Sequence, residues 1–396
     1  MLKRLLLNPF ILYSLIWLFV IILYSFNWSS LYGSLDANLF LFLILTSFIS
    51  ILFGIIYDSF IKRSKHQYNY NNKRSLKVVI GILLGFLLDF IYAGFIPLIS
   101  ELTNGELTYK DFEGIPTFHV LLVTFSLFYA CYCFYSFLFE KKKLYRKRNF
   151  LYFILICICL LTLYNRFVLI SVVCVCVLLC VFKSQKISKK LIILILFVGI
   201  IALYLFGILG NLRSGSAWNN ADYIKMIAHI NNNYPSFVSD QFLWSYVYFI
   251  SPLGNLNSYI INYNFTPDIY GFLTCLIPDF ISKRLLPAYS QQITLVSPFL
   301  TVSTGFAGAY KFGGFIGMYI LYFILSCVVL LFGKISQYRT NSFVMTTAFL
   351  DLIMIFMFFD NMLTFSGISF VLVYTICLTF KKPTNIRMEL KVYGRN

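Results

Sequence analysis

The sequence predicts an all-α, polytopic integral membrane protein with about ten transmembrane helices and one large outer loop. Its 396 residues are 60% hydrophobic and only 12% charged, whereas soluble globular chains are roughly 45–50% apolar and about 25% charged. Apolar stretches recur along the chain, and most are long enough to cross a hydrocarbon core of about 30 Å. Lys and Arg gather in alternate connections between these stretches, as in membrane-spanning proteins.

Each predicted span is an apolar run bounded by polar residues. The chain begins like a signal peptide, but the apolar run is too long and no small-x-small site follows it, so we expect it to remain as the first span. The fifth and sixth runs are joined by only Asn165 and Arg166, and their basic outer flanks favour a tight helical hairpin over one broken helix. The predicted spans are 9–26, 39–57, 78–100, 116–139, 150–164, 167–182, 191–209, 312–332, 343–363 and 366–380.

The distribution of charge gives the orientation. About 25 of the 32 Lys and Arg residues lie in connections on the side of the N-terminus, with about three acids, and such an excess marks the cytoplasmic side. Both termini are therefore predicted to be cytoplasmic, and the first two outer loops are acidic. The net charge of +17 is thus a topology signal. Its natural partner is anionic membrane lipid, and without a soluble basic domain a nucleic-acid partner is not supported.

This topology divides the chain into four parts. Residues 1–209 hold seven spans, 210–311 form a large outer loop, 312–380 hold three spans, and 381–396 form a cytoplasmic tail. The outer loop is far longer than an ordinary connection and retains Trp218, Trp244 and many other aromatic residues, so we expect it to fold against the membrane surface. Within it we predict amphipathic helices at 221–232, at 242–263 with a capping start at 239–241 and an interruption at Pro252, and at 272–286.

Arginines are scarce on the predicted outer side, where they oppose the charge bias. Arg166 lies in the outer turn of the predicted hairpin, Arg213 follows the seventh span, and Arg284 lies in the outer loop. An Arg at membrane depth costs at least about 2.5–3.5 kcal/mol, and its planar fork of donors matches phosphate oxygens. Gly210 and Gly215 flank Arg213 and allow close approach of a ligand to the backbone.

Structural roles are the alternative for both arginines. Arg166 would then reach from the hairpin turn to lipid phosphate, and Arg213 would pair with Asp222.

Acidic and histidine residues supply further candidates. Asp89, Asp351 and Asp360 lie within predicted spans, where carboxylates are rare and often functional. Asp360, near the outer end of its span, is the better candidate for an outer site, whereas Asp89 is either a buried structural group or part of a proton path. The three histidines are scattered and predict no zinc site, and His229 in the outer loop is a candidate substrate contact.

Several motifs of known chemistry are missing from the sequence. It has no phosphate-binding Gly-Lys-Ser/Thr loop, no dinucleotide fingerprint, no HExxH and no Asp-x-Asp. Nine of the ten cysteines fall in predicted spans. Six of them form three pairs with a spacing of two, which places the members of each pair on different helix faces, so apolar packing explains them best. The sequence therefore gives no support to ATP-driven transport, zinc proteolysis or a bound metal.

The pattern as a whole resembles bacterial oligosaccharide repeat-unit polymerases of the Wzy, O-antigen polymerase type. The likeness rests on about ten spans with one long outer loop, the Tyr-Asn-Arg-Phe turn at 164–167 and the Gly-x-x-Arg-x-Gly segment at 210–215. The segment 248–256, which begins with Tyr248, and the Gly-rich stretch 303–317 also resemble that group. The resemblance implies a GT-C-like architecture in the bacterial cytoplasmic membrane.

The resemblance also implies an activity, which is transfer of a growing glycan between undecaprenyl-diphosphate-linked repeat units on the outer face, giving O-antigen, capsular or exopolysaccharide. No cofactor or metal is implied, and a chain-length regulator protein is an implied partner. Arg166 and Arg213 would stabilise the leaving diphosphate, and an outer carboxylate, Asp222, Asp240 or Asp360, would take the acceptor proton. The predicted substrate-binding residues are Gly210, Gly215, His229, Asp240, Tyr248 and Arg284.

Three other functions stay open at this point. Related O-antigen ligases share the architecture, so lipopolysaccharide is a second possible acceptor. A flippase or transporter of lipid-linked oligosaccharide is a different class, but such proteins usually contain internal repeats, and none is visible here. A structural or assembly partner is the third possibility, and it would tolerate loss of both arginines.

Overall fold

A computed structural model describes residues 5–61, 75–103, 111–184, 189–337 and 340–380. The predicted cytoplasmic tail, 381–396, lies outside the described residues, as does most of the basic segment between the second and third spans.

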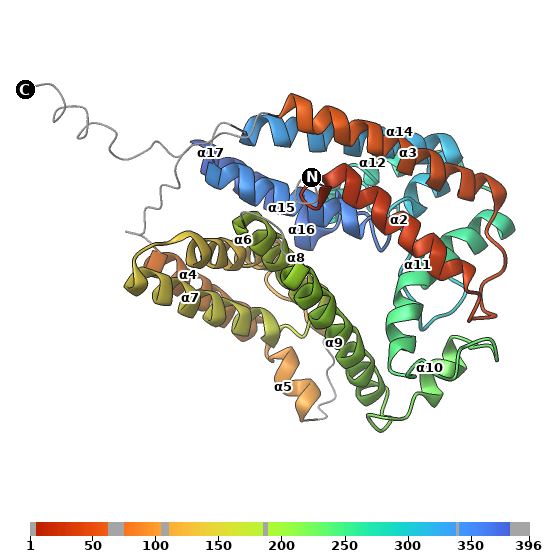
Figure 1. Ribbon diagram of the computed structural model, residues 1–396, viewed down its shortest axis with the longest axis horizontal. Helices are drawn as coiled ribbons and strands as arrows, with labels where there is room; N and C mark the ends of the chain where they lie inside the picture. The colour runs from red at the N-terminus through yellow and green to blue at the C-terminus, as the bar shows by residue number, and fades with distance from the viewer. Residues whose placement is uncertain (1–4, 62–74, 104–110, 185–188, 338–339, 381–396) are drawn as a thin grey trace, which may run out of the picture. The chain divides into compact units, whose positions relative to one another are not determined.

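The described secondary structure is helical apart from one isolated antiparallel bridge between Ser29 and Ile230, which agrees with the predicted all-α class (Figure 1). The first group of helices is α2 (Pro9–Ser25), α3 (Ala37–Phe60), α4 (Ser75–Ala93), α5 (Pro97–Leu102), α6 (Phe118–Phe139), α7 (Lys143–Thr162), α8 (Arg166–Lys183) and α9 (Lys189–Arg213). The second is α10 (Asp222–Ile227), α11 (Phe242–Asn262), α12 (Ile269–Thr274), α13 (Asp279–Leu285), α14 (Ala307–Ser336), α15 (Thr340–Phe356), α16 (Ser366–Ser369) and α17 (Val371–Phe380).

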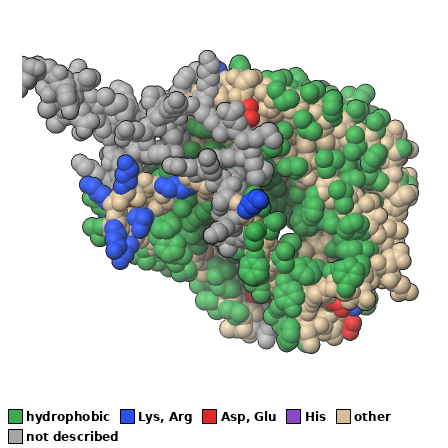
Figure 2. All heavy atoms as spheres, in the orientation of Figure 1, with side chains coloured by type: hydrophobic (Ala, Val, Ile, Leu, Met, Phe, Trp, Pro, Cys, Tyr) green, Lys and Arg blue, Asp and Glu red, His purple; other side chains and the backbone are tan. Residues whose placement is uncertain are grey.

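Several helices have the length and composition of membrane spans. Five are long and apolar enough to cross a bilayer: α3, α4, α6, α14 and the part of α9 from Leu196 to Arg213. Shorter apolar helices occur at Pro9–Ser25, Phe167–Lys183, Ser342–Phe356 and Ser366–Cys377. Figure 2 shows hydrophobic side chains over much of the visible surface. Large apolar side chains of α3 are exposed, among them Phe48 at 59% and Ile55 at 64%. A surface this apolar suits lipid and not water, so the chain is a helical membrane protein.

The number and limits of the spans differ in part from prediction. The third predicted span, 78–100, is broken, because α4 ends at Ala93, Gly94 has a φ of +81°, and α5 begins only at Pro97. The ninth, 343–363, was too long, since α15 ends at Phe356, and the tenth is divided between α16 and α17. Hydrophobicity alone did not reveal these breaks, because the residues at which α4 and α15 end are apolar or small, and the segment after α15 is apolar apart from Asp360 and Asn361. The hairpin at 150–182 is two helices, α7 and α8, as predicted.

The chain forms two compact units. The first comprises Met1–Phe60, Ser184–Leu330 and Leu350–Ser369, and the second comprises Ile61–Lys183, Leu331–Phe349 and Phe370–Asn396.

In the first unit, α2 packs closely along α3. The side chain of Asn8 caps α2 by accepting hydrogen bonds from Phe10 N and Ile11 N, and its Nδ2 donates to Gly54 O on α3 at 2.9 Å. Ser14 Oγ donates to Ser47 O at 2.7 Å, so a second polar side chain joins the two helices. Side chains thereby satisfy buried polar groups that lipid cannot satisfy.

The outer loop of the first unit is folded, as its composition predicts. Its core contains Ile224, Leu243, Val247 and Ile250, which are buried together with Tyr32 from the α2–α3 connection. Both α10 and α9 pack against α11, and α10 lies near the C-terminal end of α9 (Figure 1). The loop is therefore a packed layer that is continuous with the end of a predicted span.

Four details of the predicted loop helices were wrong. The helix predicted at 221–232 is reduced to α10, and the one predicted at 272–286 is two short helices, α12 and α13. The predicted interruption at Pro252 does not occur, since α11 continues through it, and Ser251 and Pro252 are buried. The 239–241 motif provides no side-chain cap for α11.

In the second unit, α6 packs against α4, α7, α8 and α17. One face of α6 is almost wholly buried, including Leu127, Cys131 and Tyr135. The buried cysteines fill space in this core, as their spacing predicts.

Candidate functional site

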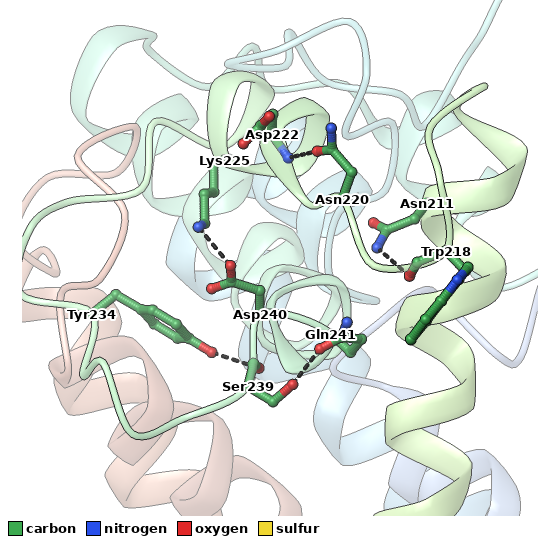
Figure 3. Close-up of polar contacts among 9 residues, drawn as sticks. All are labelled: Asn211, Trp218, Asn220, Asp222, Lys225, Tyr234, Ser239, Asp240 and Gln241. Atoms are coloured by element: carbon green, nitrogen blue, oxygen red, sulfur yellow. Dashed lines mark hydrogen bonds and ion pairs between the residues drawn. The ribbon is translucent and has the colours of Figure 1, made fainter.

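The Gly-x-x-Arg-x-Gly segment forms the C-terminal end of α9 and is anchored by a buried amide. Asn211 is fully buried, its Oδ1 accepts from Trp244 Nε1 at 2.7 Å, and its Nδ2 donates to Trp218 O at 3.1 Å. Figure 3 shows Asn211 directed toward Trp218. The single side chain thus connects α9, α11 and the start of the outer loop.

The two glycines of this segment have structural roles. A Cβ at Gly210 would lie 2.6 Å from the Trp244 ring, so the space predicted for a ligand is occupied by tryptophan. Gly215 has a φ of +76°, with Gly215 N donating to Leu212 O and Ser216 N donating to Asn211 O. This pair of bonds is a Schellman motif, which ends α9 and requires a left-handed residue.

Arg213 lies between the two glycines in the sequence and has an exposed side chain. It is the last residue of α9, in the first unit. Arg166 is the first residue of α8 and belongs to the second unit. The joint action of the two arginines on one diphosphate therefore stays a prediction.

The polar contacts around α10 involve two of the predicted site residues, Asp222 and Asp240 (Figure 3). Asp222 begins α10 with an exposed side chain, and its backbone N donates to Asn220 Oδ1 at 2.8 Å. Asp240 forms an ion pair with Lys225, with Nζ and Oδ2 separated by 2.6 Å. Since the Asp240 carboxylate is already paired with a cation, it is a weaker base candidate than the prediction assumed.

His229 lies next to these residues in a strained conformation. Its φ is +47°, its side chain is exposed, and its carbonyl accepts from Ser30 N at 2.9 Å. The backbone of His229 therefore bonds to Ser30, while its imidazole is exposed at the surface, and the predicted substrate contact stays a prediction.

Asp360 lies beyond the end of α15, beside a carboxylate that sequence reasoning missed. Burial, together with the nearby Asp279, raises the pKa of Asp360 to about 6, and burial also raises the pKa of Asp279. Asp279 N donates to Thr364 O at 2.8 Å, and Asn361 Nδ2 donates to Cys275 O at 2.9 Å. These bonds join the outer loop to the turn after α15. The two carboxylates are 81 positions apart in the sequence, so no local pattern indicated their proximity.

A row of aromatic rings joins the Arg213 end of α9 to the Asp360 turn. Trp244, which Asn211 holds, lies 6.4 Å from Tyr248, and Tyr248 stacks on Phe359 with ring centroids 6.4 Å apart and planes 13° apart. Tyr248 was predicted to bind substrate, but its ring is half-buried in this row. Through these rings, the C-terminal end of α9 and the turn after α15 both contact α11.

The remaining predicted outer cation, Arg284, is exposed in the last turn of α13. That helix begins at Asp279, so α13 carries both a carboxylate of the Asp360 pair and an exposed guanidinium.

A second carboxylate site lies in the second unit. Asp89 is fully buried, its Oδ2 lies 2.6 Å from His119 Nδ1, and its Oδ1 accepts from Ile115 N at 2.8 Å. These contacts satisfy the buried carboxylate, as the structural alternative requires, and the proton-path alternative stays a prediction. Asp351 is also fully buried, but in the first unit.

In the part of the chain that the structure describes, no three His, Cys, Asp or Glu side chains gather in a way that would hold a metal ion. In comparisons with known proteins, the chain matches no family model, no curated protein and no solved structure.

Proposed function

We propose that the protein is a membrane glycosyltransferase that polymerises lipid-diphosphate-linked oligosaccharide repeat units on the outer face of the cytoplasmic membrane. The observations that support this proposal are the exposed Arg213 at the C-terminal end of α9 and the buried Asp360, whose pKa is raised to about 6, with contacts through Asn211, Trp244, Tyr248 and Phe359 between the two segments. A fixed cation and a carboxylate that changes protonation near neutral pH are what transfer from a diphosphate to a hydroxyl requires.

In the proposed reaction, an acceptor hydroxyl of one repeat unit attacks the anomeric carbon of the glycan on the donor lipid. The bond from that carbon to the diphosphate oxygen breaks, and its electron pair stays on the lipid diphosphate. Asp360 takes the proton of the hydroxyl. Arg213 stabilises the charge that develops on the diphosphate, and Arg166 is the second proposed cation.

The proposal is tested by chain extension in vitro. Purified protein is incubated with lipid-linked repeat units from the source cells, and product length is followed by gel electrophoresis. We expect a ladder from the wild type, a loss of rate of roughly 100-fold or more in Arg213→Ala, and partial recovery in Arg213→Lys, which keeps the charge without the fork. Arg146→Ala removes an exposed cation of α7 and is the control.

The other functions give different products in the same assay. A single addition to a lipid acceptor would identify a ligase. Movement of the lipid-linked sugar across vesicles without any lengthening would identify a transporter. Wild-type ladders from Arg213→Ala would contradict the assigned role of the arginine.

A further inference from the structure

Two segments of the first unit that lie about 200 residues apart are joined into one clamp. Ser29 and Ile230 form the isolated bridge, Asn231 N donates to Trp28 O at 2.7 Å, and Ser30 N donates to His229 O at 2.9 Å. The Asn231 side chain adds a bond from Nδ2 to Asn27 O at 3.1 Å. The α2–α3 connection and the segment after α10 are therefore fixed to each other by backbone and amide groups.

This clamp is built at a conformational cost. Asn27 and His229, one on each segment, have φ values of +50° and +47°. Left-handed backbone is unfavourable for residues other than glycine, and it persists only where the surrounding structure imposes it. Both strained residues are next to the bridge contacts, so the strain serves the alignment of the two segments.

Two cavities lie along the clamp and share Asn231, and together we call them the Asn231 groove. The first has a volume of about 560 Å³ and is lined by the aromatic rings of Tyr24, Tyr32 and Phe40 and by Asn27 and Ser30. The second, of about 470 Å³, is lined by Tyr234 and by the Lys225–Asp240 pair shown in Figure 3. Each volume falls in the range of about 300–1,000 Å³ that is typical of small-molecule sites.

The lining indicates the chemistry of the ligand. Among the described residues, the first cavity is lined by no Lys, Arg, His, Asp or Glu, which disfavours an anionic group. It combines flat apolar rings with amides and hydroxyls that both donate and accept. A neutral ligand with apolar ring faces and many hydroxyl groups matches this combination, and a sugar has both properties.

We propose that the Asn231 groove binds the oligosaccharide portion of a substrate, and this assignment rests on the proposed function for the lipid-linked form of that substrate. The groove contacts hydroxyls and ring faces through Asn231, Asn27 and the aromatic side chains, whereas the diphosphate is left to the arginines. The site is one of recognition and takes no part in bond making.

The test fills the groove without disturbing the fold. Gly33 lines the first cavity, and a Cβ there would meet nothing within 4 Å, so Gly33→Trp places a ring in the groove. Gly199→Trp is the matched control, because Gly199 on α9 is equally open and does not line the groove. Phe40→Ala, which removes a lining ring, is a second variant.

Binding is measured by saturation-transfer NMR, using the lipid-free oligosaccharide repeat unit from the source cells and purified protein in nanodiscs. We expect the wild type and Gly199→Trp to bind, Gly33→Trp to lose affinity at least 10-fold, and Phe40→Ala to lose several-fold. Failure of the wild type to bind, or equal binding by Gly33→Trp, would overturn the proposal.

The extension assay separates this proposal from the proposed function. Oligosaccharide binding by a wild type that forms no ladder would overturn the polymerase and leave the groove supported. A ladder from Gly33→Trp with the wild-type dependence of rate on acceptor concentration would overturn the groove and leave the polymerase supported.

Discussion

At the scale of single residues, the C-terminal end of α9 is held against α11 by the contacts of Asn211 and Gly210 with Trp244. Asn211 is fully buried and bonded to the Trp244 indole, and Gly210 allows that indole to lie against the helix backbone. The motif suggested ligand binding because glycine and arginine are common in phosphate sites. Its glycine instead makes room for a neighbouring helix, and the arginine is held in place by this packing.

The Gly210→Ala variant tests this packing. The added methyl would lie 2.6 Å from the Trp244 ring, and overpacking of this kind costs about 1–3 kcal/mol. We expect a lower Tm in detergent by differential scanning fluorimetry. Gly199→Ala on the same helix has open space and should gain helix propensity, so its Tm should be unchanged or raised. A Tm that rises in both variants would contradict the packing role.

Asp360 gives a prediction about pH. A general base must be ionised, and because burial raises the pKa of Asp360 to about 6, the carboxylate is protonated below that pH. The rate of chain extension should therefore rise with pH through about 6 and level off above it. Asp279→Asn removes a neighbouring negative charge that raises this pKa, so the inflection should move to lower pH.

Asp360→Asn is the complementary variant for the pH profile. It should lose most of the rate and the inflection together. A wild-type profile in Asp360→Asn would assign the inflection to another group.

At the scale of elements, the residues that end a helix decide which side chains lie at its terminus. The Schellman motif at Gly215 ends α9 directly after Arg213. Similarly, α4 ends at Ala93, before Gly94 with its positive φ and well before the end of the predicted span at residue 100. In both places, a left-handed residue reverses the direction of the backbone and exposes polar groups at a helix terminus.

The end of α9 is tested by substitution of Gly215, whose φ is +76° and whose Cβ position is open. Gly215→Ala adds only the backbone strain of a left-handed L-residue, about 1–2 kcal/mol. Gly215→Asn should lose less, since asparagine tolerates this conformation better. The ratio of the two losses in urea unfolding in detergent is the measurement. Equal stability of all three proteins would exclude strain at this position.

At the scale of the whole molecule, the charge distribution predicts that the segment after α9 lies on the outer side of the membrane and that α7 begins on the cytoplasmic side. The structure shows apolar helices of membrane length and a folded layer at 221–250, but orientation stays a prediction from the Lys and Arg distribution.

Orientation is tested by thiol labelling in spheroplasts. Phe237, at 89% exposure the most accessible large apolar side chain of the loop, is changed to Cys, and exposed Arg146 on α7 is changed to Cys as the control. A membrane-impermeant maleimide should label Phe237→Cys above the wild-type background and label Arg146→Cys only after lysis. The reverse result would invert the topology.

The sequence by itself determined the helical class, the positions of most apolar helices and the folded state of the outer loop. These properties follow from local hydrophobicity and from the need to satisfy every backbone polar group within lipid, which the chain expresses in every short window. The tertiary structure alone decided that Gly210 receives Trp244, that Asp279 approaches Asp360, and that the segments at Ser29 and Ile230 form a clamp. Such contacts join residues that are distant in the chain, and they depend on packing between helices that no local pattern encodes.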